Sequence, residues 1–218
     1  MHIHVPDGVL PVWLWSLGYL LLAFFLSISL RKVRGDEKRG IYAAAMSAAM
    51  LVAMSIPLGV PYHINLTVLA GIILGPWWAL ISDFVTNFVL ATFGHGGITI
   101  VGLNTIVTWI ESLIGLYIFK ILGRAFKQKS WRSAVAAGVS TFIALALSAL
   151  LVIGIVAASG INPSEAIHEN EFDQVSITIF ASITLPIALI GAVVEAIVTS
   201  LIVTYMRKIG TTILKGVA

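Results

Sequence analysis

Residues 64–93 read INLTVLAGIILGPWWALISDFVTNFVLATF, an apolar stretch interrupted at its centre by Gly75-Pro76. As one helix this stretch would be about 45 Å long, whereas the hydrocarbon core of a bilayer is only about 30 Å thick. As two helices it forms a hairpin that turns at Gly75-Pro76, because proline is tolerated in the first turn of a helix and not in its interior. The way this stretch divides therefore decides how often the chain crosses a membrane.

The composition indicates an integral membrane protein. Of the 218 residues, 59% are hydrophobic and 11% are charged, and the mean hydropathy is +1.02, whereas soluble domains carry about 25% charged residues. The apolar runs are continuous rather than alternating, which predicts spanning helices and not the strands of a barrel. The sequence contains no cysteine, so it gives no information about redox compartment or thiolate metal sites.

The positions of the basic residues favour the hairpin. With seven crossings, all 13 Lys and Arg fall on one side, in residues 31–39, 120–132 and 207–215. With a single crossing at residues 64–93, the second of these clusters would move to the side opposite the first. Because cytoplasmic loops are enriched in Lys and Arg, we expect an all-α polytopic membrane protein of seven transmembrane helices. Its amino terminus is expected outside and its carboxyl terminus in the cytoplasm.

We expect residues 1–218 to form a single transmembrane domain. It begins with an arm at residues 1–11 that inserts into the helix bundle, and Pro186 is expected to kink the last helix. The predicted membrane spans are residues 12–30, 41–56, 62–75, 76–93, 98–119, 133–159 and 175–206.

The predicted topology places all five histidines on the outer side: His2, His4, His63, His95 and His168. A helix from Ile64 to Leu74 would be about 16 Å long, which places His63 near the middle of the bilayer. Polar groups at that depth are typically functional. Residues 57–61, Pro-Leu-Gly-Val-Pro, cannot form a regular helix and must line a cavity or contact protein. We expect the arm to descend and meet His63.

The arm opens with MHIHVPDGVL at residues 1–10. It lacks the basic segment and the clear cleavage site of a signal peptide, so we expect the arm to be retained. Because His2 is bulky and methionine aminopeptidases generally need a small second residue, we expect Met1 to stay, with a free amine after deformylation. That amine, the amide nitrogen of His2 and the His2 imidazole can chelate one metal in a plane, with His63 as a further nitrogen ligand. Four planar nitrogens suit Ni(II) or Cu(II). The alternative is a frayed, solvated terminus.

Three stretches of the sequence match a pattern that is known from other proteins. They are His4 to Pro11; His63-Ile64-Asn65 with Gly71 and Gly75-Pro76-Trp77; and His95-Gly96-Gly97-Ile98-Thr99 with Gly102 and Asn104-Thr105. Together they resemble the cobalt/nickel substrate-binding subunits of the CbiM/NikM family, the S components of energy-coupling-factor transporters. The resemblance covers at least residues 1–125.

The resemblance implies a seven-helix fold with the amino terminus tucked into its centre. It implies Ni(II) or Co(II) as the transported substrate, without an organic cofactor. It also implies a prokaryotic cell membrane and three kinds of partner: a transmembrane coupling subunit, ATPase subunits and a small accessory membrane subunit.

Relative to the family start, this chain has two additional residues before the Pro-Asp-Gly turn. Alignment on the turn makes His4 the family's histidine, and alignment on the amine makes it His2. Because the implied chelate needs the amine beside the histidine, we favour Met1, His2 and His63 as ligands. Further candidates, as ligands or as groups that support the ligands, are His4, His95 and Asn104.

Four polar residues lie inside the predicted spans: Asp83, Asn87, Glu111 and Glu195. Asp83 and Asn87 are one helical turn apart and share a face. The four residues either form a polar path below the metal or hydrogen-bond between helices, with protonated carboxyl groups. His168, in the acidic loop 165–173, either attracts cations or is simply solvated.

The second predicted span carries small residues four apart, where another helix can approach closely. In the wider transporter class such a face docks the coupling subunit, and packing within this chain is the alternative. The residues are Ala44, Ala45, Ala48 and Ala49.

Sequence motifs of enzymes are missing. There is no Gly-x-x-x-x-Gly-Lys phosphate loop, no His-Glu-x-x-His motif and no Gly-x-Ser-x-Gly elbow, and the net charge of +3 does not indicate a nucleic-acid partner. We therefore expect a high-affinity nickel/cobalt-binding membrane subunit of an ATP-driven energy-coupling-factor uptake transporter, with ATP hydrolysed by partner subunits. The alternative is an autonomous divalent-metal channel or a proton-coupled carrier that uses Asp83, Glu111 and Glu195.

Overall fold

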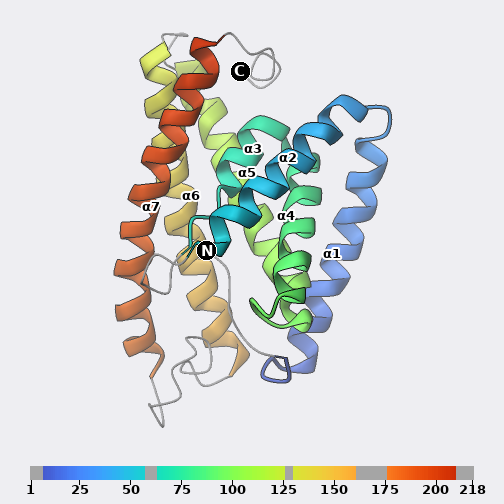
Figure 1. Cartoon of the computed structure of the whole chain (residues 1–218). Helices are drawn as coiled ribbons and strands as arrows, with labels where there is room; N and C mark the ends of the chain where they lie inside the picture. The colour runs from blue at the N-terminus through green and yellow to red at the C-terminus, as the bar shows by residue number, and fades with distance from the viewer. Residues whose placement is uncertain (1–6, 57–62, 126–129, 161–175, 210–218) are drawn as a thin grey trace.

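The computed structural model describes residues 7–56, 63–125, 130–160 and 176–209, and within these residues all regular structure is helical (Figure 1). Seven α-helices are present in this part of the chain, as the sequence predicts, and a short 3-10 turn, η1 (Ile98–Ile100), precedes the fifth. The helices are α1 (Val12–Lys32), α2 (Glu37–Ser55), α3 (Thr67–Leu74), α4 (Pro76–Thr92), α5 (Val101–Ala125), α6 (Ser130–Ser159) and α7 (Ile177–Lys208).

The apolar stretch 64–93 forms two helices, so the hairpin prediction is confirmed. The chain reverses at Gly75, whose φ of 78° is accessible to glycine and strained for other residues. Pro76 follows at the first position of α4. Proline lacks an N–H, which costs nothing at this position because the first N–H groups of a helix have no intrahelical acceptor. Trp109 of α5 donates its indole N–H to the Pro76 carbonyl at 2.8 Å, which fixes the turn against the central helix.

Four helices are long and apolar enough to cross a membrane on their own: α1, the η1–α5 unit, α6 and α7. The other three are shorter, and the 8 residues of α3 extend only about 12 Å. In the described part of the chain the helix ends lie within six residues of the predicted bounds. The largest differences are at the start of α3, Thr67 against a predicted 62, and at the end of α5, Ala125 against a predicted 119. Helix α7 continues through Pro186.

The distribution of side chains is that of a multi-pass membrane protein. Large apolar side chains on the outside are exposed, among them Leu20 (69%), Ile190 (69%) and Leu201 (64%), where lipid would cover them. The carboxyl groups of Asp83 and Glu111, by contrast, belong to fully buried side chains in the middle of the bundle. Ionisable groups in membrane proteins face the bundle interior in this way.

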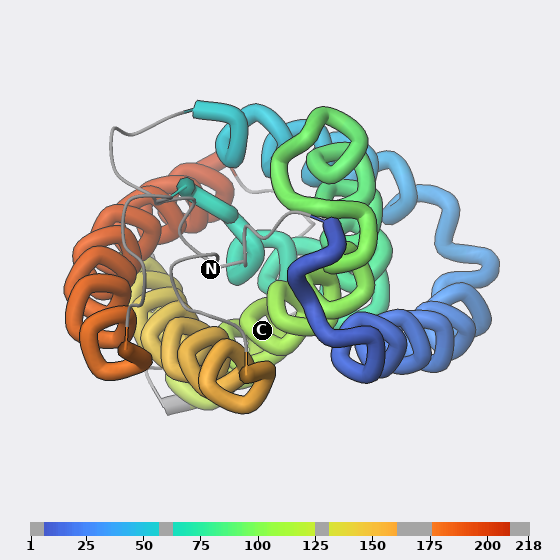
Figure 2. The backbone as a smooth tube through the Cα atoms, turned by 90° about the horizontal axis from the view of Figure 1, so that it is seen from below, coloured from blue at the N-terminus to red at the C-terminus, as the bar shows by residue number. Residues whose placement is uncertain are grey.

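Helix α5 is the centre of the bundle, and it packs against α1, α3, α4 and α6. Helix α7 packs chiefly against α6, and these two form one side of the molecule, with α1 on the other (Figure 2). The largest apolar core joins α2 through α7. Its fully or almost fully buried members include Met50, Met54, Ile72, Leu90, Phe119, Ala137 and Val203.

The basic residues in the described part of the chain gather at one end of the bundle. They lie at the ends of α1, α5 and α7, in the turn between α1 and α2, and at the starts of α2 and α6, and Figure 1 shows these helix ends together at the top. This clustering is what the predicted topology requires. The side of the membrane that this end faces stays a prediction.

Candidate metal centre

His95 is placed at the opposite end of the bundle by the way α4 ends. Gly94, with a φ of 78°, donates its N–H to the Ala91 carbonyl at 3.1 Å, and the His95 N–H bonds the Leu90 carbonyl at 3.0 Å. This pair of hydrogen bonds is a Schellman motif, which satisfies the last carbonyls of a helix. The backbone of His95 is therefore fixed directly after α4.

His63 reaches the same place by a non-helical segment before α3. Helices α3 and α4 both adjoin the turn at Gly75, but α4 runs about 25 Å away from it and α3 only about 12 Å. Residues 63–66 are not helical, and four residues span at most about 13 Å. The prediction that residues 64–66 are helical is therefore wrong: this non-helical segment carries His63 past the depth at which α3 begins.

The two histidines meet, although they are 32 positions apart in the sequence (95 − 63). Their ring centroids are 4.7 Å apart, and the rings make an angle of 73°. Both residues are partly buried. Imidazole nitrogen is a good ligand for divalent nickel, cobalt and zinc, so this pair is the candidate metal centre among the described residues.

The arm is anchored beside this pair by Asp7. One carboxylate oxygen of Asp7 accepts hydrogen bonds from the backbone N–H and the hydroxyl of Thr99, both at 2.7 Å, and the other accepts from the Ile98 N–H at 3.1 Å. The hydrogen bonds from Thr99 hold the pKa of Asp7 below its ordinary value, since they favour the charged form. Asp7 therefore caps the start of η1 and α5 as an anion.

Gly97 allows this close approach. A β-carbon at Gly97 would lie 2.4 Å from Oδ1 of Asp7 and 2.7 Å from its backbone nitrogen, so any larger residue would push the arm away. Asp7, Gly97 and Thr99 belong to the stretches that carry the family resemblance, but sequence reasoning did not identify them as partners. The candidate ligands Met1, His2 and His4 lie outside the described residues, as does His168.

A second anchor holds the segment between His63 and α3. The Glu195 carboxylate of α7 accepts the N–H of Asn65 at 3.0 Å and the N–H of Leu66 at 3.1 Å, one at each oxygen. Leu66 has a φ of 60°, a left-handed conformation that is strained for leucine. This conformation at Leu66 explains why α3 begins only at Thr67.

The remaining buried carboxyl groups lie around the first residue of α3. The Thr67 hydroxyl hydrogen-bonds the Glu111 carboxylate. The Ser112 hydroxyl contacts the Thr67 carbonyl at 2.8 Å and Oδ2 of Asp83 at 3.1 Å. Asp83, Glu111 and Glu195 thus take part in hydrogen bonds between helices, directly behind the His63 segment.

The two predicted asparagines, Asn87 and Asn104, lie within α4 and α5. The side-chain amide of Asn87 donates to the Asp83 carbonyl at 2.8 Å and to the Thr108 hydroxyl at 3.2 Å. Asn104 is buried in the first turn of α5, and its backbone carbonyl accepts a hydrogen bond from Thr108 at 3.0 Å.

Residues 4–213 match the model of the CbiM family, described as the cobalt uptake substrate-specific transmembrane region. The chain belongs to the CbiM family. The contact between His63 and His95 and the Asp7 anchor at Thr99 both lie in the stretches in which the sequence resembles other members of this family.

Named relatives agree with the CbiM assignment. The chain is 30% identical over 151 residues to a protein of Archaeoglobus fulgidus named as a fused nickel transport protein, NikMN, and 30% identical over 142 residues to the cobalt transport protein CbiM of Clostridium tetani. These alignments cover 67% and 61% of this chain. They cover 50% and 57% of the relatives, so the chain spans little more than half the length of the curated proteins it matches.

Solved structures show the same fold. A crystal structure of a transition metal transporter matches with a TM-score of 0.76 at 25% identity, covering 99% of this chain and 97% of that one. A truncated transition metal transporter matches with a TM-score of 0.75 at 24% identity, covering 97% of this chain and all of that one. The described part of this chain therefore has the fold of these two solved transporters.

The small residues of α2 lie on the outside of this CbiM-family bundle. Their four positions are all exposed, whereas Met46 and Met50 on the other face of the helix are buried. Packing within the described part of the chain does not account for the small residues. They are Ala44, Ala45, Ala48 and Ala49.

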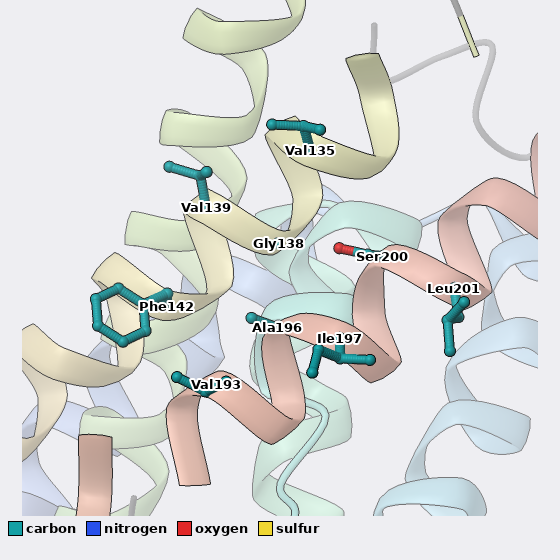
Figure 3. Close-up of a pocket in the computed structure, with 9 residues that line it drawn as sticks. All are labelled: Val135, Gly138, Val139, Phe142, Val193, Ala196, Ile197, Ser200 and Leu201. Atoms are coloured by element: carbon teal, nitrogen blue, oxygen red, sulfur yellow. The ribbon is translucent and has the colours of Figure 1, made fainter. Parts of the chain in front are cut away.

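A groove between α6 and α7 is separate from the metal centre (Figure 3). It has a volume of about 460 Å³, and its walls are apolar except for Ser200, whose hydroxyl donates to the Ala134 carbonyl at 2.9 Å. The groove offers no metal ligand. Its lining residues are Val135, Gly138, Val139, Phe142, Val193, Ala196, Ile197, Ser200 and Leu201.

Proposed function

We propose that this chain is the high-affinity metal-binding membrane subunit of an ATP-driven energy-coupling-factor uptake transporter in a prokaryotic cell membrane, with Ni(II) or Co(II) as its substrate. The observation that carries the proposal is the meeting of His63 and His95, with ring centroids 4.7 Å apart, beside the Asp7 anchor of the arm. Membership of a family described by cobalt uptake supports it.

The proposed ligands are the Met1 amine, the His2 amide nitrogen and imidazole, and the His63 imidazole. Among the described residues, no group of three or more His, Asp or Glu side chains is arranged to hold a metal, so His63 and His95 need ligands from elsewhere in the chain. The six residues before Asp7 span up to about 20 Å when extended, and this sets how far Met1 and His2 can reach from the Asp7 anchor. His4, His95 and Asn104 remain candidates as ligands or as groups that support them.

The proposed partners supply the energy. Because the sequence has no phosphate loop, we assign ATP hydrolysis to ATPase subunits, which act through a transmembrane coupling subunit, with a small accessory membrane subunit. The exposed face of α2 with its four alanines is the proposed docking surface for the coupling subunit, since small residues allow close helix approach.

The alternative function is an autonomous channel or a proton-coupled carrier built on Asp83, Glu111 and Glu195. The hydrogen bonds of these groups with residues 65–67 and with Ser112 favour a structural use instead. The two functions differ in vesicles that contain this chain alone. The proposed subunit binds metal tightly but accumulates little of it, whereas a channel or carrier accumulates it without ATPase subunits.

The direct test is nickel titration of the purified full chain with its native amino terminus, in competition with cobalt. We expect His63→Ala to remove most metal binding while the protein stays folded and monodisperse in detergent. His168→Ala is the matched control, because His168 is predicted to lie in a solvated loop. A His63→Ala variant that binds nickel as tightly as the parent would refute the proposed site.

A further inference from the structure

Glu195 lies on the helix that is otherwise remote from the metal centre. Helix α7 packs chiefly against α6, yet the Glu195 side chain, only 1% exposed, extends to the segment that precedes α3. There its two oxygens accept the N–H groups of two consecutive residues, Asn65 and Leu66. A carboxylate is well suited to this, because each oxygen is an acceptor and charge-assisted hydrogen bonds are the stronger kind.

The N–H groups of Asn65 and Leu66 constrain the path of the backbone between His63 and α3. Asn65 is 1% exposed and Leu66 is 9% exposed, so their N–H groups would lack water as a substitute partner, and a buried N–H without a partner is costly. Leu66 also holds a φ of 60°, which persists only where the surroundings enforce it. Glu195 stabilises this conformation by accepting hydrogen bonds from the residues two and three positions after His63.

The next residue is held from the other side of the segment. Thr67 bonds Glu111 of α5 through its hydroxyl, and its carbonyl accepts a hydrogen bond from Ser112. Residues 65–67 are thus fixed between α5 and α7. Of these contacts, those of Glu195 are the nearest to His63 along the chain.

We infer that Glu195 is a positioning residue for metal binding: its carboxylate holds the backbone of Asn65 and Leu66 so that the His63 imidazole stands beside His95 and the arm. This inference rests on the proposed function, in which His63 is a metal ligand. Groups that orient a ligating histidine typically change metal affinity by about 10–100-fold when they are replaced.

The informative variant is Glu195→Gln. Glutamine has nearly the same shape but offers one acceptor oxygen and one NH₂ donor, so it bonds one of the two N–H groups and presents a donor to the other. Thr199→Val is the matched control, since Thr199 is fully buried one turn further along α7, and its hydroxyl has no hydrogen-bond partner in the part of the chain that the structure describes. Both variants are made in the full chain.

Two measurements separate positioning from general stability. The first is amide hydrogen exchange of Asn65 and Leu66 in the metal-free protein, with the amides of α5 as an internal reference. The second is nickel titration, together with the visible absorption spectrum of bound Ni(II), which reports its ligand geometry. For Glu195→Gln we expect faster exchange at the two amides, unchanged exchange in α5, an altered spectrum and about 10–100-fold weaker nickel binding. Thr199→Val should resemble the parent.

The outcomes distinguish this inference from the function on which it rests. Unchanged exchange at Asn65 and Leu66 in Glu195→Gln overturns the inference, whatever the affinity. Faster exchange with unchanged nickel affinity also overturns it, because the segment would then not determine binding. If His63→Ala still binds nickel, the proposed function fails, and the inference that rests on it fails too. The exchange data on Glu195→Gln do not depend on nickel, so the two failures are distinguishable.

Discussion

Replacing Asp7 by alanine tests whether the arm must be anchored for metal to bind. The substitution removes three hydrogen bonds at 2.7, 2.7 and 3.1 Å, and it leaves the Ile98 and Thr99 N–H groups at the start of α5 without their cap. Loss of a capping side chain costs about 0.5–2 kcal/mol, typically about 1 kcal/mol. Because Asp7 is itself exposed, water replaces part of these interactions, so we adopt about 1 kcal/mol.

This free energy favours the anchored arm over the released arm. If the arm must be in place for the metal to bind, a loss of about 1 kcal/mol weakens apparent nickel affinity by at most about fivefold, and a loss of about 2 kcal/mol by at most about 30-fold; both limits are reached when the released arm predominates. We expect the helical bundle itself to remain folded, because the arm contributes little to the main apolar core.

The assay is calorimetric titration of nickel into the purified full chain in detergent. Asp36→Ala is the matched control: Asp36 also caps a helix, accepting the Arg39 N–H at 3.4 Å at the start of α2, but it lies at the opposite end of the bundle. Asp7→Ala should bind nickel several-fold more weakly than Asp36→Ala. Equal affinity in the two variants would refute the claim that the Asp7 anchor supports the metal centre.

Three further predictions follow from the same geometry. Two residues added ahead of Met1 should abolish nickel binding in titrations, because they displace the amine by about 7 Å; an extended chain that binds normally would exclude the amine as a ligand. Nickel affinity should fall between pH 7 and about pH 5.5, because protons compete for imidazole and amine nitrogens. Asp7 does not contribute to that fall, because hydrogen bonds from Thr99 lower its pKa. Its anchoring is complete above about pH 3.9, the unfolded pKa, and is lost only as the pH drops through the lower pKa of the folded state. Asp7→Asn should therefore show the same pH dependence of nickel affinity as the parent. A single cysteine in place of Phe93, which is 83% exposed, should react with an impermeant reagent from outside the cell, and one in place of Arg34 only from inside; the reverse pattern would invert the topology.

Much of the fold could be predicted because its signals are local. Gly75-Pro76 marks a reversal within two residues, and the clusters of Lys and Arg mark helix ends directly. The start of α3 differs from its prediction by five residues, and the reason lies far away in the sequence. The partner that holds Asn65 and Leu66 in non-helical positions is Glu195, 130 and 129 positions along the chain.

The candidate site could be predicted only in part, for the same reason. His63 and His95 were expected separately, from the depth of one and from the family resemblance of the other, but nothing in the sequence indicates that their rings lie 4.7 Å apart. The Asp7–Thr99 pair spans 92 positions. Such pairs follow from the packing of α1, α4 and α5, which composition and periodicity do not specify.

The residues around the site share one structural property: each lies at a helix end or hydrogen-bonds the backbone at one. His95 follows the Schellman motif of α4, Asp7 caps η1 and α5, and Glu195 satisfies N–H groups just before α3. Helix ends leave backbone groups without partners, and within a membrane such groups cost several kcal/mol unless the protein supplies partners. The anchors therefore serve the local backbone and the site together, so replacing Asp7 or Glu195 should loosen the backbone segment that each one bonds and lower metal affinity. Replacing the His63 imidazole should lower metal affinity and should also remove its hydrogen bond to the backbone of Ile56 at the end of α2.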